Sequence, residues 1–144
     1  MAKKLRAWMG VVLVYGLAMG AEAFASAESD AEADAFEAAQ IWLQLVDEGR
    51  YSESWDSAAI SFQTSVGQQE WENLLKVVRA PLGKVIARAM TSTEYKKSLP
   101  GAPDGEYVVI QYKTAFETKT AAVETVIPKR EFDGRWGISG YYIK

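Results

Sequence analysis

The sequence contains no cysteine and no histidine among its 144 residues. Without cysteine there is no disulfide and no thiol nucleophile, so the fold must be stabilised by its hydrophobic core. Without histidine the chain lacks the side chain that most often serves as a general base near neutral pH. Zinc sites of histidine and cysteine and nucleophile systems that need either residue are therefore excluded. We expect no metal site and no cofactor, and any acid–base chemistry would rest on carboxylates, lysine or tyrosine.

A surplus of positive charge is also missing. The formal net charge is −3, and the chain beyond its first residues holds no cluster of basic side chains. Nucleic-acid affinity comes largely from neutralising phosphates, so an acidic chain of this kind is not expected to bind nucleic acid. The acidic run Glu28 to Asp34 lacks the glycine and the terminal glutamate of a calcium loop, and we interpret it as the start of a helix.

The first 27 residues have the pattern of a cleavable signal peptide. Lys3, Lys4 and Arg6 form a basic start, and an uncharged stretch of about 14 residues follows, short of the roughly 20 that span a bilayer. Small residues then offer cleavage after Ala25 or Ala27. We predict a signal peptide over residues 1–27 and one domain over residues 28–144. The processed protein is expected in the periplasm or outside a bacterial cell, with no membrane attachment.

Helical periodicity dominates the first half of the remaining chain. Apolar residues at three- and four-residue spacing predict a helix over residues 35–48, closed by Gly49. A second, short helix is expected around Tyr51 and Trp55. The spacing of Ser65 and Gln68 fits a capping box, which predicts the start of a third helix. Pro81 and Gly83 are expected to end this helix.

The second half alternates with the period of a β-strand. Strands are predicted over residues 84–98, 107–116, 121–127 and 136–142, with a proline- and glycine-rich turn over residues 99–105. Pro128 marks an edge or a bulge. Helices followed by strands predict an α+β fold, in which about three N-terminal helices pack on a curved four-stranded antiparallel meander.

Several motifs resemble those of a bacterial family called domain of unknown function 4019. They are Asp47–Tyr51 with Ser54-Trp55, Leu99–Val109, Glu124–Val126 and Gly140–Lys144. The resemblance covers nearly all of residues 28–144, with Gly137 as a departure because a larger residue is expected there. It implies an exported protein with a fold similar to the cystatin or nuclear-transport-factor-2 type. It implies no activity.

Four side chains are the candidates for a binding site: Glu124, Arg88, Tyr112 and Trp136. Glu124 lies between apolar residues of the third predicted strand, where it is either a pocket acid or a residue on the solvent face opposite Val123. Arg88 could pair with it across the sheet or remain an exposed cation. The tryptophans after residue 27 could line a ligand site or belong to the core. The loop of residues 99–105 is either a recognition loop or a plain turn.

These observations leave three functional hypotheses. The first is a non-catalytic binding or interaction module of the cell envelope, and it agrees best with the missing catalytic side chains. The second is a carrier of small apolar ligands with a cup between helices and sheet. The third is a carboxylate-dependent enzyme of cone-like fold. The expected partner is accordingly a protein or a small apolar ligand, and a homodimer formed through the sheet is a further option.

Overall fold

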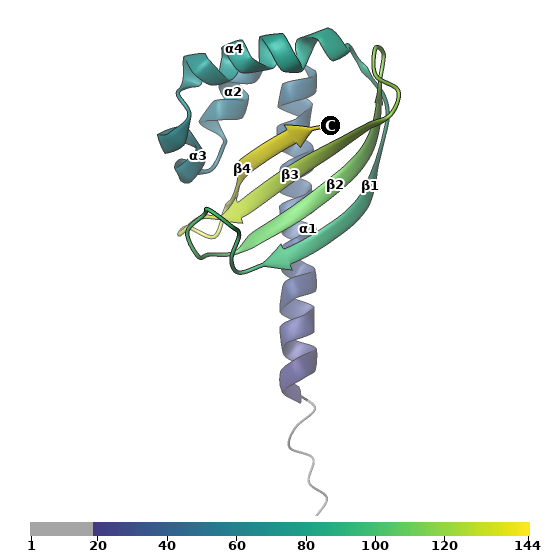
Figure 1. Cartoon of the computed structure of the whole chain (residues 1–144). Coiled ribbons are helices and arrows are strands. Elements are labelled where there is room, and N and C mark those ends of the chain that lie inside the picture. The colour runs from purple at the N-terminus through teal and green to yellow at the C-terminus, as the bar shows by residue number, and fades with distance from the viewer. Residues whose placement is uncertain (1–18) are drawn as a thin grey trace, which may run out of the picture.

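The computed structural model describes residues 19–144, in which helices are followed by a four-stranded antiparallel sheet (Figure 1). The order of elements confirms the predicted α+β class. The basic start of the predicted signal peptide and most of its apolar stretch lie outside the described residues. None of the described helices is both long and apolar enough to cross a membrane. The elements are α1 (Met19–Asp47), α2 (Tyr51–Asp56), α3 (Ile60–Ser65), α4 (Gln68–Val78), the 3-10 turn η1 (Ala80–Leu82), β1 (Val85–Lys96), β2 (Tyr107–Phe116), β3 (Ala122–Arg130) and β4 (Trp136–Ile143).

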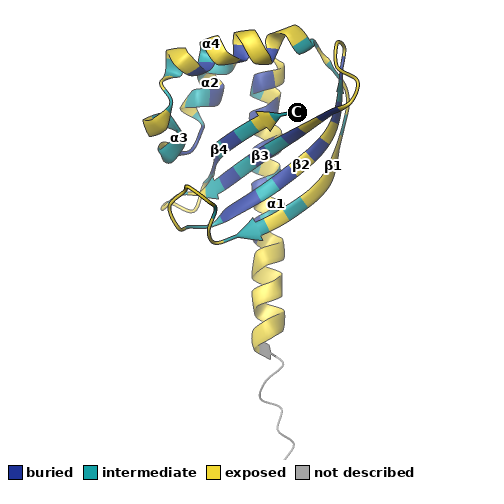
Figure 2. Cartoon of the chain, viewed as in Figure 1, coloured by how far each residue is buried: buried dark blue, intermediate teal, exposed yellow. Residues whose placement is uncertain are grey.

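Helix α1 lies across one face of the sheet and contacts all four strands. Ala31, Ala35 and Ala39 recur at four-residue spacing and are buried, so the helix backbone comes close to the strands. The space between α1 and the sheet is filled by side chains of the core, and Figure 2 shows the buried centres of β2 and β3. The helix begins earlier than predicted, and residues 20–30 are exposed. The core includes Leu43, Val46, Val108, Ile110, Tyr112, Val126 and Ile138.

The short helices α2, α3 and α4 form a second layer beside the C-terminal half of α1 (Figure 1). Ser54 of α2 joins the layer to α1. Its carbonyl oxygen accepts a hydrogen bond of 2.8 Å from Trp42 Nε1, and its hydroxyl accepts one of 3.0 Å from Trp71 Nε1. Both tryptophans are buried and belong to the core.

The predicted start of the last helix is wrong. Ser65 is the final residue of α3, and its hydroxyl donates to the carbonyl of Ser61 instead of capping α4. The backbone of Gly67 forms the N-cap of α4 without a side-chain hydrogen bond. Helix α3 was not predicted, because six residues are too few for their apolar side chains to show a helical period. The predicted stop is confirmed, with Pro81 inside η1 and Gly83 at a φ of 77°.

All three strand pairings of the sheet are antiparallel, in the order β1-β2-β3-β4. The range of β2 matches the prediction, and of the two alternatives for β3 the structure has the one in which Glu124 is enclosed. Val123 points to solvent, whereas Glu124 lies on the face against α1 and is 0% exposed. Both faces of this strand carry apolar side chains, so either face could be expected to pack against the core. The buried acid is tolerated because it is paired with a cation.

A β-bulge changes the facing of β4 halfway along the strand. Ile127 pairs with Gly140 while Pro128 pairs with Ile138, so Ser139 has no opposite residue. A regular strand would place Ile138 and Tyr142 on the same face of the sheet. Because of the bulge, Ile138 and Tyr141 face the core, and Tyr142 is 58% exposed.

Gly137, the departure from the family pattern, sits at the closest approach of β4 to the helical layer. A Cβ atom at this position would lie 2.9 Å from the backbone of Ala59. The amide of Ala59 also donates to the carbonyl of Ile138 at 2.9 Å. The expected larger residue cannot fit here, since the chain segment before α3 packs directly against the strand.

Candidate functional site

The side chain of Glu124 is completely buried between the sheet and the end of α1. Its Oε1 accepts hydrogen bonds from Arg88 Nε at 2.8 Å and from Thr114 Oγ1 at 2.6 Å. Its Oε2 accepts from Arg88 Nη2 at 3.2 Å and from the hydroxyl of Tyr141. The acid is thus neutralised by one guanidinium and held by two hydroxyl groups, which is how a buried carboxylate is stabilised.

Arg88 extends this cluster to the last turn of α1. Its Nη1 donates to Asp47 Oδ2 at 2.7 Å, and Arg79 Nη2 donates to Asp47 Oδ1 at 3.1 Å. Burial opposes the charge of Arg88, but its hydrogen bonds to Asp47 and Glu124 raise its pKa above the ordinary value. Arg79 is 3% exposed and lies over the ring of Phe116 at 4.6 Å. Two anions and two cations therefore balance inside one cluster.

The sheet register explains why distant residues meet here. Arg88 of β1 lies opposite Thr114 of β2, and Tyr112 of β2 lies opposite Glu124 of β3, all on the face against α1. The pair of Glu124 and Arg88, one of the alternatives in the sequence, forms in the structure. Asp47, Thr114, Arg79 and Tyr141 were not predicted as site residues, because neither their local pattern nor the motifs that contain Asp47 and Tyr141 indicate a contact with Glu124 or Arg88.

Tyr112 borders the same cluster without joining its hydrogen bonds. Its hydroxyl is buried and has no hydrogen-bond partner among the described residues. Burial raises the pKa of Tyr112 to about 12. Burial and the nearby charge of Glu124 likewise raise the pKa of Tyr141 well above its ordinary value. Both phenols therefore remain neutral at physiological pH.

The two tyrosines should respond differently to removal of the hydroxyl. Tyr112→Phe is expected to leave the free energy of unfolding at pH 7 unchanged or slightly higher, because a buried hydroxyl without a partner contributes nothing. Tyr141→Phe is expected to lower it by about 1–3 kcal/mol, since Glu124 loses a hydrogen-bond donor. Urea unfolding measures both. Equal losses in the two variants would contradict this account.

Alkaline pH should act through Tyr112 as well. Its pKa is raised in the folded protein from the ordinary value of 10, so the unfolded chain loses this proton first, and stability is constant below pH 10 and decreases as the pH rises towards about 12. We expect the urea midpoint of the wild type to fall over this range and that of Tyr112→Phe to fall less. Parallel pH profiles for the two proteins would contradict the assignment.

Trp136 lies apart from the other three candidates. It borders a separate groove of about 450 Å³ between α1 and the turn that joins β3 to β4, together with Ile41 and Glu37. The groove beside the cluster, about 340 Å³ in volume, is lined by Arg88, Tyr112 and residues of α1. The four predicted residues therefore do not form one site.

The cluster offers little for catalysis. Glu124 has no exposed surface, and its two oxygens already accept four hydrogen bonds. Tyr142 is 58% exposed and is not part of the cluster. Within residues 19–144 no group of three or more acidic side chains is arranged to hold a metal ion. The arrangement instead ties all four strands to α1 and to the segment after α4.

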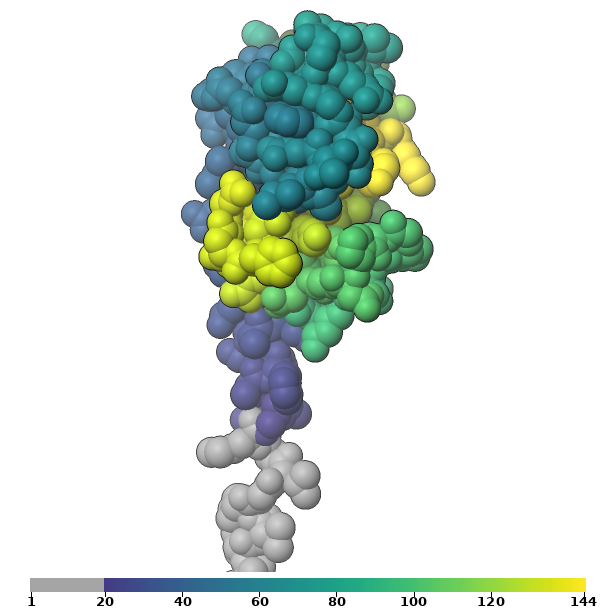
Figure 3. All heavy atoms as spheres, turned by 90° about the vertical axis from the view of Figure 1, so that its left-hand side faces the viewer, coloured from purple at the N-terminus to yellow at the C-terminus, as the bar shows by residue number. Residues whose placement is uncertain are grey.

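A larger opening lies at the other side of the molecule, between β4, the helices α3 and α4, and the loop of residues 97–106. We call it the β4 cleft, and its volume is about 620 Å³. Phe62, Trp71 and Leu74 line the helical wall, and Glu70 is the one charged residue of the lining. Figure 3 shows α3 and α4 in teal and the loop in green, with the end of the chain in yellow between them.

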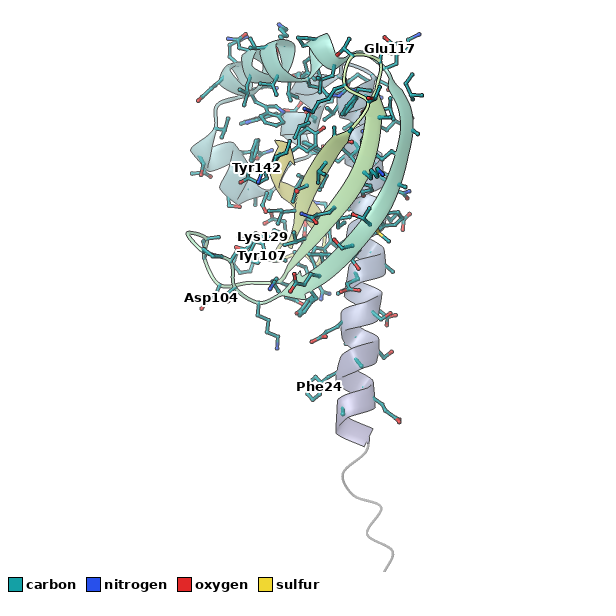
Figure 4. The ribbon with its side chains drawn as sticks, turned by 45° about the vertical axis from the view of Figure 1, so that its right-hand side comes forward. Phe24, Asp104, Tyr107, Glu117, Lys129 and Tyr142 are labelled. Atoms are coloured by element: carbon teal, nitrogen blue, oxygen red, sulfur yellow. The ribbon has the colours of Figure 1, made fainter. Side chains whose placement is uncertain are left out.

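The β4 cleft also reaches the outer face of the sheet. Tyr142 and Tyr107 lie on this face, as Figure 4 shows, and Lys129 Nζ lies 5.8 Å from the ring centre of Tyr107. The loop considered earlier for recognition lines the cleft from Leu99 to Pro103. Its proline and glycine content and the tryptophan Trp71 were the sequence signals that pointed to this region. The rest of the helical wall had no such signal, because α3 was not predicted.

A family model described as a protein of unknown function (DUF4019) matches residues 38–141 of the chain. No curated protein and no solved structure is significantly similar to the chain.

Proposed function

The chain belongs to the DUF4019 family, and we propose that it is an exported, non-catalytic binding module that holds its partner in the β4 cleft. The proposal rests on the difference between the Glu124 cluster and the β4 cleft. The most deeply buried acid, Glu124, is fully paired and away from solvent, whereas the β4 cleft is wide, open and lined mainly by apolar side chains. Open apolar clefts with a few polar groups are the usual places where proteins bind other molecules.

The packing of the core supports a surface site over an internal cup. Leu43 and Val46 of α1 pack with Ile110 and Val126 of the sheet in the space where a carrier would enclose its ligand. An apolar ligand there would have to displace core side chains, at the cost of their burial. The β4 cleft needs no such rearrangement.

Export is supported by the way the start of α1 is arranged. Residues 20–30 are exposed, Ala31 is buried, and Glu32 accepts hydrogen bonds from Tyr95 N and Thr93 Oγ1, each at 3.2 Å. Cleavage after Ala25 or Ala27 would therefore remove helical turns that make no contact with the sheet. It would leave every core residue of α1 in place.

We predict that the protein recovered from the envelope or medium of a bacterium expressing the full chain begins at Ser26 or Glu28. Its intact mass decides the question. A protein starting at either residue should also unfold at the same urea concentration as the longer chain, because the removed turns are exposed. Recovery of a mass that still includes Met1 to Gly20 would overturn the prediction.

Selection from a displayed library of linear peptides tests the binding function. We expect enriched peptides that bind the wild type and lose binding to Leu74→Glu, which places a charge on the helical wall of the cleft. The matched control is Val77→Glu, on the same helix, 74% exposed and not part of the cleft. Circular dichroism verifies that both variants are folded. The proposal is overturned if no peptide is enriched, or if enriched peptides are indifferent to Leu74→Glu.

A further inference from the structure

Strand β4 is an edge strand with unused backbone hydrogen-bonding groups. Val123 and Lys144 exchange both of their backbone hydrogen bonds, each of 2.9 Å. In an antiparallel pair such residues alternate with residues whose N–H and C=O groups point away. The register pairs Glu124 with Ile143 and Val126 with Tyr141, so the backbone groups of Tyr141 and Ile143 point outwards. Neither residue has a backbone hydrogen bond to another partner within residues 19–144.

The Tyr141 part of this open edge lies in the β4 cleft, and Ile143 continues the edge beyond the lining of the cleft. Tyr141 lines the cleft, and Phe62, Trp71 and Leu74 face it from the helical wall. The arrangement is a groove between an edge strand and a helix. Such grooves accept an extended peptide that adds a strand to the sheet, with main-chain hydrogen bonds for affinity and side-chain contacts for specificity.

The opposite edge of the sheet, β1, is protected. Its pairing with β2 is interrupted by irregularities after Val85 and after Met90. In addition, Glu32 of α1 accepts the outward N–H of Tyr95 at 3.2 Å. Bulges and charged groups are the usual means of preventing unwanted strand pairing. The edge of β4 has its bulge at Ser139, before the open segment, and no side chain of residues 19–144 forms a hydrogen bond with the backbone groups of Tyr141 and Ile143.

Resting on the binding function proposed above, we infer that the partner is an extended peptide segment of another protein, which pairs with β4 as a fifth strand. Apolar side chains at alternate positions of the peptide contact the helical wall. A basic side chain pairs with Glu70, the one charged residue of the lining. The ligand is therefore a segment rich in β-branched residues that carries a lysine or arginine.

Amide hydrogen exchange of the exported protein tests the pairing directly. The probe is an acetylated peptide of alternating valine and threonine with one lysine. At a peptide concentration about tenfold above the dissociation constant, exchange at Tyr141 and Ile143 should slow by about tenfold. Tyr142, whose amide already faces β3, is the internal control and should change little. Unchanged exchange at Tyr141 and Ile143 with bound peptide overturns the inference.

Two N-methylated forms of the peptide separate strand addition from other binding. Methylation of the amides that face β4 should weaken binding by about tenfold or more, because each removes a main-chain donor, whereas methylation of the alternate amides should not. If the peptide binds but both forms bind as well as the parent, strand addition is wrong while the binding function stands. If the designed peptide does not bind and the library selection yields no peptide, both proposals fail.

Two further measurements test whether the partner is basic and whether a second copy of this chain occupies the β4 cleft. Glu70→Gln should weaken the lysine peptide more than the same peptide with alanine in place of lysine. If Glu70→Gln weakens the binding of both peptides equally, the inference of a basic partner is wrong. Sedimentation of the free protein tests a second copy as the occupant. A stable dimer whose Tyr141 and Ile143 amides are already protected would replace the peptide by β4 of another chain.

Discussion

Glu124→Ala is expected to lower the free energy of unfolding by about 3–5 kcal/mol, the usual cost of removing one partner from a buried ion pair. Arg88 would keep Asp47 but lose two hydrogen bonds to the acid, and the hydroxyl groups of Thr114 and Tyr141 would lose their acceptor. Because Arg88 cannot lose its proton, its charge would remain in a partly buried position without full compensation. Urea unfolding at pH 7 gives the value.

Two variants make the loss in Glu124→Ala interpretable. Glu124→Gln keeps the shape of the side chain and should fall between the wild type and Glu124→Ala. Glu94→Ala is the matched control, because Glu94 is a strand acid that pairs with Lys96 but is largely exposed. Its effect should stay within about 0.5 kcal/mol, as for most surface changes. A loss for Glu124→Ala as small as that of the control would show that the buried cluster does not stabilise the fold.

Trp42→Ala is expected to cost about 3–5 kcal/mol, as for other large aromatic truncations in a core. Trp42 is 3% exposed, and its ring centre lies 5.2 Å from that of Tyr141 and 6.2 Å from that of Trp71. The substitution opens a cavity where α1, α4 and β4 meet. It also removes the hydrogen bond to Ser54 that joins α1 to α2.

The control for Trp42 is its neighbour Ile41, which is 60% exposed on the same helix. Ile41→Ala should change stability by less than about 1 kcal/mol, since little of its surface is buried. Denaturant unfolding of the two variants compares them under identical conditions. Similar losses at both positions would mean that the helical layer is not anchored through Trp42.

The elements with strong periodicity could be predicted from the sequence, and those set by tertiary contacts could not. Strand β2 was predicted with its correct range because its apolar and polar residues alternate clearly. In β3 both faces carry apolar residues, so the sequence left the facing of Glu124 open, and the observed facing depends on Arg88. The bulge at Ser139 and the close approach at Gly137 depend on segments distant in sequence.

The same distinction applies to the candidate site. The pairing of Glu124 with Arg88 was one of two readings of a single pattern, and only the register decides between them. Asp47 and Arg79 complete the cluster from helix ends, where charged residues are common and carry no signal of burial. The β4 cleft could be predicted only in part, because its loop is marked by proline and glycine while its wall includes the unpredicted α3.

We propose that the β4 cleft, and not the Glu124 cluster, is where this protein binds its partner. A map of backbone NMR shifts during titration with a peptide enriched in the library selection tests this proposal. We expect the shifting residues to gather at α4, β4 and the loop of residues 97–106, while Arg88, Tyr112 and Gln40 stay unchanged. Shifts centred on Arg88 and Tyr112, with the cleft unaffected, would contradict it.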